Sequence, residues 1–177
     1  MKKTGFSGWM SITMSAMVLM VAGCNHPTTN PPAPTATSST TANANVTGPA
    51  KPAATADDNT WGTYLSEQGK SLGKDVPGHP YIYLIPAGDS DAATARRKEE
   101  AQSIGFSIGP IVIPGSLLVL GGPDAQQTNA FAATLPAMIK AHALKGIVVL
   151  IVSDTTQKDA LTKAFAPTDA TLRFVTM

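Results

Sequence analysis

The run Ile147-Val148-Val149-Leu150-Ile151-Val152 is the most strand-like stretch of the chain, because all six residues are branched and apolar. A second run, Ser116-Leu117-Leu118-Val119-Leu120, is apolar after its serine. A strand that does not alternate between polar and apolar residues is typical of a sheet covered on both faces. The two runs therefore predict two strands of a buried sheet.

Helical and extended segments alternate along the rest of the folded part. Helices are expected where apolar residues recur at helical spacing or where Ala, Arg, Lys and Glu dominate. They cover residues 60–72 (with Asp58 or Asn59 as cap), 91–103 (starting at Ser90 or Asp91), 125–145 and 156–165, and two further strands cover 81–85 and 171–175. The order β-α-β-α-β-α-β predicts mainly parallel pairing with right-handed crossovers.

Three residues set limits on these elements. Gly105 is expected to end the second helix, and Pro136 to kink or split the third. Because Pro110 cannot donate to a strand ladder, residues 106–113 should lie at an edge or outside the sheet. We therefore expect an α/β fold, a small single domain of about four mainly parallel strands with three to four helices packed on the sheet. The last strand could also pair antiparallel at an edge.

Residues 25–58 differ in composition from the domain, which we place at 59–177. They contain six prolines and many Thr and Ala, no aromatic residue, and Val46 as the only large aliphatic one. Such a segment buries too little apolar surface to offset the entropy of ordering it. We expect residues 24–58 to be a disordered tether with a root-mean-square span of roughly 30 to 35 Å.

The N-terminus has the three parts of a secretory signal peptide. Lys2 and Lys3 precede an uncharged, mostly apolar run, and small residues lead to Cys24. The sequence Val21-Ala22-Gly23-Cys24 resembles the lipobox of bacterial lipoproteins, with Val21 where leucine is usual. The resemblance implies a signal peptide at 1–23, cleavage before Cys24, diacylation of its thiol and acylation of the new amino terminus. Two or three acyl chains hold a protein firmly on a membrane, whereas one binds only marginally.

Composition narrows the class of partner. The chain has 13 Lys and Arg and 12 Asp and Glu, and loss of Lys2 and Lys3 leaves it near neutral. A neutral domain argues against a nucleic-acid partner, which needs a basic face. Cys24 is the only cysteine, so the mature protein has no intrachain disulfide and no cysteine-based metal or redox site. Asn25 is not aspartate, which in the lipoprotein sorting pattern of enteric-type bacteria implies the periplasmic face of the outer membrane.

Acidic residues follow three of the expected strands. Asp89, Asp124 and Asp154 lie in strand-to-helix turns, where ligands bind in open α/β sheets. Carboxylates that converge there could hold Mg²⁺ for phosphoryl chemistry. The alternative is structural, because Asp is a preferred residue at helix starts, where it accepts unpaired N–H groups. No cofactor is predicted.

Other motifs for chemistry are incomplete. Gly121-Gly122-Pro123-Asp124 lacks the third glycine of a dinucleotide fingerprint and is explained by a tight turn. No G-x-S-x-G elbow is present. His79 lies in a Gly/Pro loop and His142 in an expected helix, so nothing local brings them to one metal site. No catalytic residue is predicted.

Aromatic side chains concentrate at the start of the domain. Trp61, Tyr81 and Tyr83 could form a patch that stacks on a sugar or peptide ligand. The alternative is that they pack the first helix on the sheet.

The leading functional hypothesis is a membrane-anchored periplasmic lipoprotein that acts as a binding or envelope-assembly module and not as an enzyme. Its partners would be the membrane, through the lipid on Cys24, and a periplasmic or outer-membrane protein. The alternative is a metal-dependent phosphoesterase or nucleotide-binding protein that uses the acids at the carboxyl edge of the sheet. A third possibility, a factor in immunity or exclusion, has no positive sign in the sequence.

Overall fold

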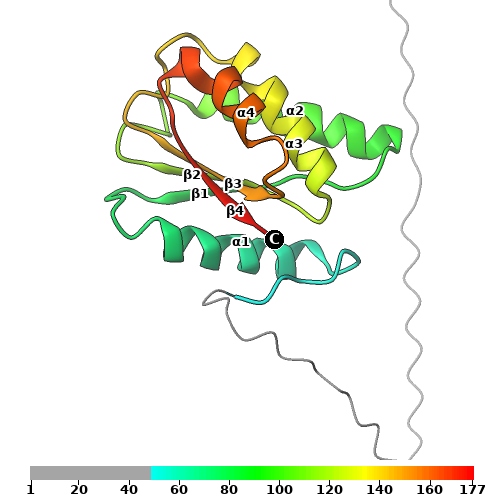
Figure 1. The fold of residues 1–177 in the computed structure, drawn as a ribbon. Coiled ribbons are helices and arrows are strands. Elements are labelled where there is room, and N and C mark those ends of the chain that lie inside the picture. The colour runs from blue at the N-terminus through cyan, green and yellow to red at the C-terminus, as the bar shows by residue number, and fades with distance from the viewer. Residues whose placement is uncertain (1–48) are drawn as a thin grey trace, which may run out of the picture. The chain divides into compact units, whose positions relative to one another are not determined.

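The structure, a computed structural model, describes residues 49–177. The expected signal peptide, Cys24 and most of the expected tether lie outside the described residues. Four parallel strands form one sheet in the order β1-β2-β3-β4. Three helices cover one face of this sheet and a fourth covers the other (Figure 1). The elements are α1 (Asp58–Leu72), β1 (Pro80–Leu84), α2 (Asp91–Ser107), β2 (Leu117–Gly121), α3 (Ala125–Thr134), the 3₁₀ turn η1 (Leu135–Met138), β3 (Val148–Ser153), α4 (Lys158–Phe165), the 3₁₀ turn η2 (Ala166–Thr168) and β4 (Thr171–Thr176).

The expected α/β class and the mainly parallel sheet are confirmed, and the last strand is parallel like the others. Each strand pairs with the next one along the chain. Crossovers of one hand that always step in the same direction place α2, α3 and α4 on the same face (Figure 1). The strand order never reverses, so the sheet lacks the topological switch point at which α/β folds usually open a crevice for ligands.

The core under the three helices is the larger of two. Alternate residues of the inner strands, such as Leu118, Leu120 and Ile151, point into it and are fully buried. Phe131 of α3 and Phe165 of α4 pack on them. A sheet in which β2 and β3 are buried on both faces needs the continuous apolar runs seen in the sequence.

Of the helices that the structure describes, only α1 covers the opposite face (Figure 1). Trp61, Tyr64 and Leu65 lie against the strand side chains of that face, with Val119 and Leu150 among them. The rings of Trp61 and Tyr64 meet edge to face at 86° and 5.6 Å between centroids. Ala53 and Ala56, which we assigned to the tether, already contact this part of the domain.

The cap of α1 is Asp57 and not Asp58 or Asn59 as expected. The Asp57 carboxylate accepts a 2.8 Å hydrogen bond from the backbone N–H of Thr60 and a second bond from its hydroxyl. These bonds hold the pKa of Asp57 below its ordinary value. The helix therefore begins at Asp58, earlier than its apolar spacing suggested. Apolar spacing does not show this start, because capping depends on the backbone angles of the residue before the helix.

The expected end of α2 at Gly105 was wrong. The helix continues to Ser107, and Gly105 lies in its last turns with helical neighbours on both sides. Ile108 is extended, Gly109 has a φ of +94° and Pro110 follows, so the chain leaves the helix there. Glycine lowers helix stability by roughly 1 kcal/mol relative to alanine but does not by itself end a helix.

The segment after α2 lies outside the sheet, which is one of the two positions expected from Pro110. Ile108 and Val112 form an isolated bridge within it. Val112 points inward and is buried, whereas Ile111 and Ile113 on either side are more than half exposed. The segment is therefore an apolar loop that projects from the amino-terminal edge of the sheet.

The expected long helix over 125–145 was also wrong in extent. It ends at Thr134, and η1 carries Pro136 in its first turn before Ile139 becomes extended. His142, expected in a helix, lies in a turn with a φ of +61°. Pro136 was expected to kink or split this helix, and the regular helix ends before it because proline removes an N–H and crowds the preceding turn. Likewise α4 starts at Lys158 and not at Thr156.

An ion pair ties the edge strand β4 to the loop after α1. Both terminal nitrogens of Arg173 donate to the Asp75 carboxylate, at 2.7 and 2.5 Å, and one also donates to the carbonyl of Leu72. The bidentate hydrogen bonds from Arg173 lower the pKa of Asp75 to about 2. The pair joins segments nearly one hundred residues apart.

Asp75→Asn should make stability less dependent on pH below pH 4. A carboxylate whose pKa is lowered on folding adds stability that is complete above its unfolded pKa of ~3.9 and is lost as the pH falls toward 2. The variant should be less stable than the parent at pH 7 and lose less stability between pH 4 and pH 2. Urea unfolding at a series of pH values measures this, and parallel curves for the two proteins would contradict it.

Candidate functional site

The acids at the carboxyl edge of the sheet serve as hydrogen-bond acceptors in turns. Asp124 is the N-cap of α3 and accepts from the backbone N–H groups of Gln126 and Gln127, at 2.8 and 3.1 Å. Asp89 accepts from the side-chain amide of the same Gln127 at 2.5 Å. The structure thus links two of the three predicted acids through the first turn of α3.

Asp154 lies after β3 and is bound from two sides. It accepts from the Thr156 hydroxyl at 2.5 Å, from the Thr156 N–H at 3.1 Å and from the amide of Asn129 at 2.9 Å. The Thr156 and Asn129 side chains hold the pKa of Asp154 below its ordinary value. The carboxylate therefore stays ionised and shapes the turn between β3 and α4.

Buried polar atoms near this edge are not all paired. Asn129 is 2% exposed, and its side-chain oxygen and the hydroxyl of the fully buried Thr128 have no hydrogen-bond partner. Within residues 49–177, no three His, Cys, Asp or Glu side chains lie close enough together to hold a metal ion. A cation here would need the amide oxygen of Asn129 or backbone carbonyls beside Asp154.

Asp124→Ala should lower the free energy of unfolding by ~0.5 to 2 kcal/mol, because two N–H groups of α3 lose their acceptor. Asp124→Asn keeps an acceptor at the same place and should change stability by only a few tenths of a kcal/mol, since the two residues cap about equally well. Chemical denaturation of both variants measures the difference. Equal losses for both would show that the charge of Asp124, and not its capping geometry, stabilises the turn.

The three aromatic candidates do not form one patch. Trp61 is fully buried on the α1 face, where its indole N–H donates to the carbonyl of Ala53 at 3.1 Å. Tyr81 and Tyr83 lie on the other face of β1, against the larger core. The Tyr81 hydroxyl donates to the carbonyl of Ile111 and so holds the apolar loop after α2. The sheet separates the indole from the two phenols, so these three rings share no stacking surface.

The Gly-rich turn after β2 is explained by a close approach of two chains. A Cβ on Gly122 would lie 2.1 Å from the carbonyl oxygen of Ile85. Ile85 also donates its N–H to the carbonyl of Gly121 at 2.7 Å. The glycine therefore allows the segment after β1 to pass beside the turn, which agrees with a structural role.

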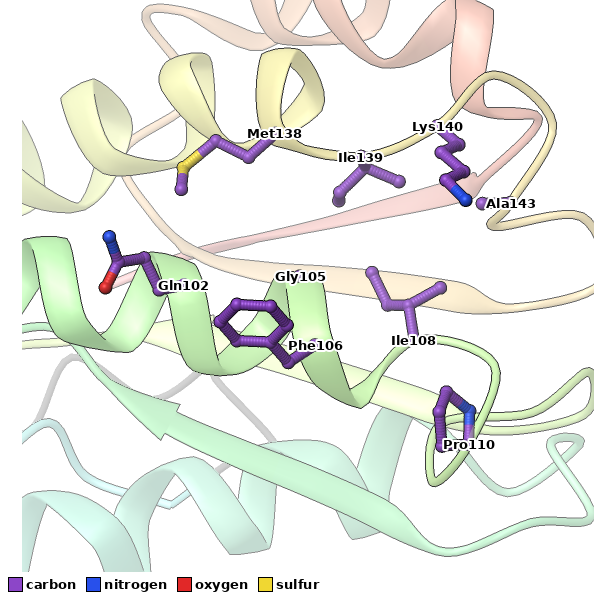
Figure 2. Close-up of a pocket in the computed structure, with 9 residues that line it drawn as sticks. All are labelled: Gln102, Gly105, Phe106, Ile108, Pro110, Met138, Ile139, Lys140 and Ala143. Carbon is purple, nitrogen blue, oxygen red and sulfur yellow. The ribbon is translucent and has the colours of Figure 1, made fainter.

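Large apolar side chains are exposed at the opposite, amino-terminal edge of the sheet. Phe106 is 81% exposed, and Ile111, Ile113 and Met138 are about half exposed. A groove of about 450 Å³ lies between the end of α2 and the chain that follows α3 (Figure 2). Its lining residues are Gln102, Gly105, Phe106, Ile108, Pro110, Met138, Ile139, Lys140 and Ala143, and we call it the α2–η1 groove.

The α2–η1 groove exists because α2 is loosely covered. Of its seventeen residues only Ala101 and Ile104 are buried. A Cβ added at Gly105 would have one neighbouring atom within 4 Å, the carbonyl oxygen of Met138 at 3.6 Å. The backbone of α2 is therefore exposed to the groove at this position. Helix α3 ends before it can pack along the last turns of α2, and η1 takes its place.

Sequence reasoning missed the α2–η1 groove because it depends on two element boundaries that were wrong. With α2 ended near Gly105, Phe106 belonged to an extended segment, and with one helix over 125–145, Met138 belonged to that helix. One signal was available: residues 101–123 carry no charged side chain at all. A stretch that long contains more apolar residues than one strand can bury.

Comparison of the chain with protein-family models, curated proteins and solved structures finds no match. None of the helices within residues 49–177 is long and apolar enough to cross a membrane.

Proposed function

We propose that this chain is a lipid-anchored, non-catalytic binding module of the bacterial cell envelope, with the α2–η1 groove as its binding surface. The observation that carries the proposal is the exposure of Phe106 and Met138 on the two sides of an apolar groove (Figure 2). Clustered exposed apolar side chains on a small domain mark an interaction site, because their contact with water is unfavourable.

The arrangement of the carboxyl edge of the sheet also supports this proposal. There the acids are engaged in capping and turn bonds, and the strand order opens no crevice. The exposed apolar side chains gather instead at the amino-terminal edge of the sheet, where the loops lead into the strands. A surface of this kind binds by burial of apolar area and needs no catalytic group.

The proposed lipid anchor is inferred from the lipobox sequence that ends at Cys24. Acyl chains on Cys24 would hold the module on the periplasmic face of the outer membrane, with residues 24–58 as a tether between membrane and domain. Labelling of cells with radioactive palmitate should mark the protein, and Cys24→Ser should abolish the label and release the protein from the membrane fraction. Persistence of the label in Cys24→Ser would refute the assignment.

A photo-crosslinking amino acid tests the binding surface in cells. Placed at Phe106, it should give covalent products whose partner mass spectrometry identifies, and Met138→Asp should reduce their yield. Leu72 is the matched control, since it is an exposed apolar side chain on α1, outside the groove. Equal product patterns at Phe106 and Leu72 would overturn the assignment of the α2–η1 groove as the binding surface.

The second candidate is a metal-dependent phosphoesterase or nucleotide-binding protein that uses the carboxyl edge. The unpaired amide oxygen of the buried Asn129 beside Asp154 is the observation in its favour. Millimolar Mg²⁺ should then raise the melting temperature, and Asp154→Asn should remove that rise while Asp91→Asn, on the exposed first turn of α2, should not. Melting that is unaffected by Mg²⁺ would refute this candidate.

A further inference from the structure

The charged side chains that line the α2–η1 groove and the cavity next to it are all cations. A second, smaller cavity of about 290 Å³ between α2 and α3 shares Met138 with it. The residues lining the two cavities include three cations, Arg97, Lys98 and Lys140, and no carboxylate. Arg97 donates to the carbonyls of Pro86 and Gly88, and it forms no salt bridge within residues 49–177. Among the described residues, neither lysine forms a salt bridge.

The walls of the α2–η1 groove are apolar and its end is cationic. Figure 2 shows Phe106 and Ile108 on one side, Met138 and Ile139 on the other, and the Lys140 side chain beside Ala143 at one end. The bare backbone at Gly105 widens the groove between these walls. An apolar channel with a lysine at its end matches a molecule that has an apolar chain and one anionic head.

The volume and the lining of the α2–η1 groove suit one small apolar chain. A cavity of about 450 Å³ is in the range that encloses one small ligand. A flexible methionine side chain and the space that a glycine leaves free can adapt to the shape of an alkyl chain. Burial of such a chain contributes about 0.8 kcal/mol per methylene.

We propose that the α2–η1 groove binds a single-chain anionic amphiphile, a long-chain carboxylate. Its alkyl chain lies between Phe106 and Ile108 on α2 and its following turn, and Met138 and Ile139 on the opposite wall. Its head group pairs with Lys140. This inference rests on the proposed function and adds to it the chemical class of the ligand.

Calorimetric titration of the whole mature chain tests the ligand class, with Cys24→Ser so that no lipid is attached. The probes are dodecanoate and dodecyltrimethylammonium, which share a chain length and differ in charge, both below their micellar concentrations. Dodecanoate should bind one to one and at least tenfold more tightly than the cation. Equal affinities, or binding of neither, would overturn the inference.

Two variants locate the site. Gly105→Leu fills the groove and should weaken dodecanoate binding at least tenfold without a loss of melting temperature, because it removes a glycine from a helix. Gly62→Leu is its matched control, since Gly62 lies in α1 and no neighbouring atom is within 4 Å of the position that its Cβ would take. Lys140→Glu should also weaken binding tenfold, and Lys74→Glu, in the loop after α1, should not. Unchanged binding in Gly105→Leu would refute the groove as the site.

Vesicles separate this inference from the proposed function. Binding to phosphatidylglycerol vesicles without binding of monomeric dodecanoate would mean that the surface docks on a bilayer, and the ligand inference would fail. If dodecanoate does not bind but the crosslinker at Phe106 gives specific products, the ligand inference fails and the proposed function stands. If neither experiment gives binding, both fail.

Discussion

Trp61→Ala should lower the free energy of unfolding by ~3 to 5 kcal/mol, which is a large part of the roughly 5–15 kcal/mol typical of a whole domain. The side chain is fully buried, and its indole N–H bonds to Ala53. The effect is large because α1 is the only helix on its face of the sheet within residues 49–177, so none of the other described helices can close the cavity (Figure 1). Urea denaturation followed by circular dichroism measures the loss.

Two controls separate packing from ligand binding at Trp61. Leu72→Ala, on the same helix but exposed, should change stability by no more than about 0.5 kcal/mol. Trp61→Phe keeps an apolar ring but loses the bond to Ala53, and should fall between the two. If Trp61→Ala kept the stability of the parent protein, the packing of α1 on the sheet would not depend on this side chain, and the prediction would fail.

Gly122→Ala should destabilise the domain by ~1 to 3 kcal/mol or more, although it adds only one methyl group. The new Cβ would lie 2.1 Å from the backbone oxygen of Ile85, and a carbonyl cannot rotate away as a side chain can. Either the turn after β2 or the segment after β1 must move, and each is held by the bond from Ile85 to Gly121. Thermal and urea unfolding measure the change.

Gly62→Ala is the matched control for Gly122→Ala. At Gly62 no atom lies within 4 Å of an added Cβ, and the residue is inside α1. The same substitution should therefore stabilise the protein, by roughly 0.5 to 1 kcal/mol, since alanine is the better helix former. Two glycine-to-alanine changes of the same sign would contradict the role of the close approach at Ile85.

The residues on which the stability of the fold is expected to depend most lie away from the proposed binding surface. Trp61 and Gly122 fix α1 and the carboxyl-edge turns on the sheet. The α2–η1 groove lies at the other edge, on the least buried helix, where substitutions such as Gly105→Leu leave the core intact. The variants that test binding should therefore fold, and the variants that test stability should spare the groove.

The residue types by themselves determined the class of the fold. Runs such as Ile147 to Val152 are apolar throughout, and only a sheet covered on both faces buries every side chain of such a strand. The alternation with helical segments then requires parallel crossovers, and all four strands are parallel. The lipobox prediction at Cys24 also depends only on local sequence and stays a prediction.

Element ends were predicted less well, for a physical reason. Gly105 lowers the helix propensity of its segment, but the contacts around Ala101 and Ile104 offset this loss. Helix α2 therefore continues past Gly105. Pro136 ends α3, whereas the apolar spacing beyond it suggested more helix. Local preferences of about 1 kcal/mol are easily reversed by packing, which sequence spacing does not record.

Only the tertiary structure decided where the candidate sites lie. The uniform strand order removes the crevice that the acids after the strands would have shared, and the sheet puts Trp61 and Tyr81 on opposite faces. The α2–η1 groove arises where α2 and η1, distant in sequence, fail to cover each other's apolar side chains. Local sequence sets which faces are apolar, but which of them stay open depends on long-range packing, because burial is a property of neighbours in space and not of neighbours along the chain.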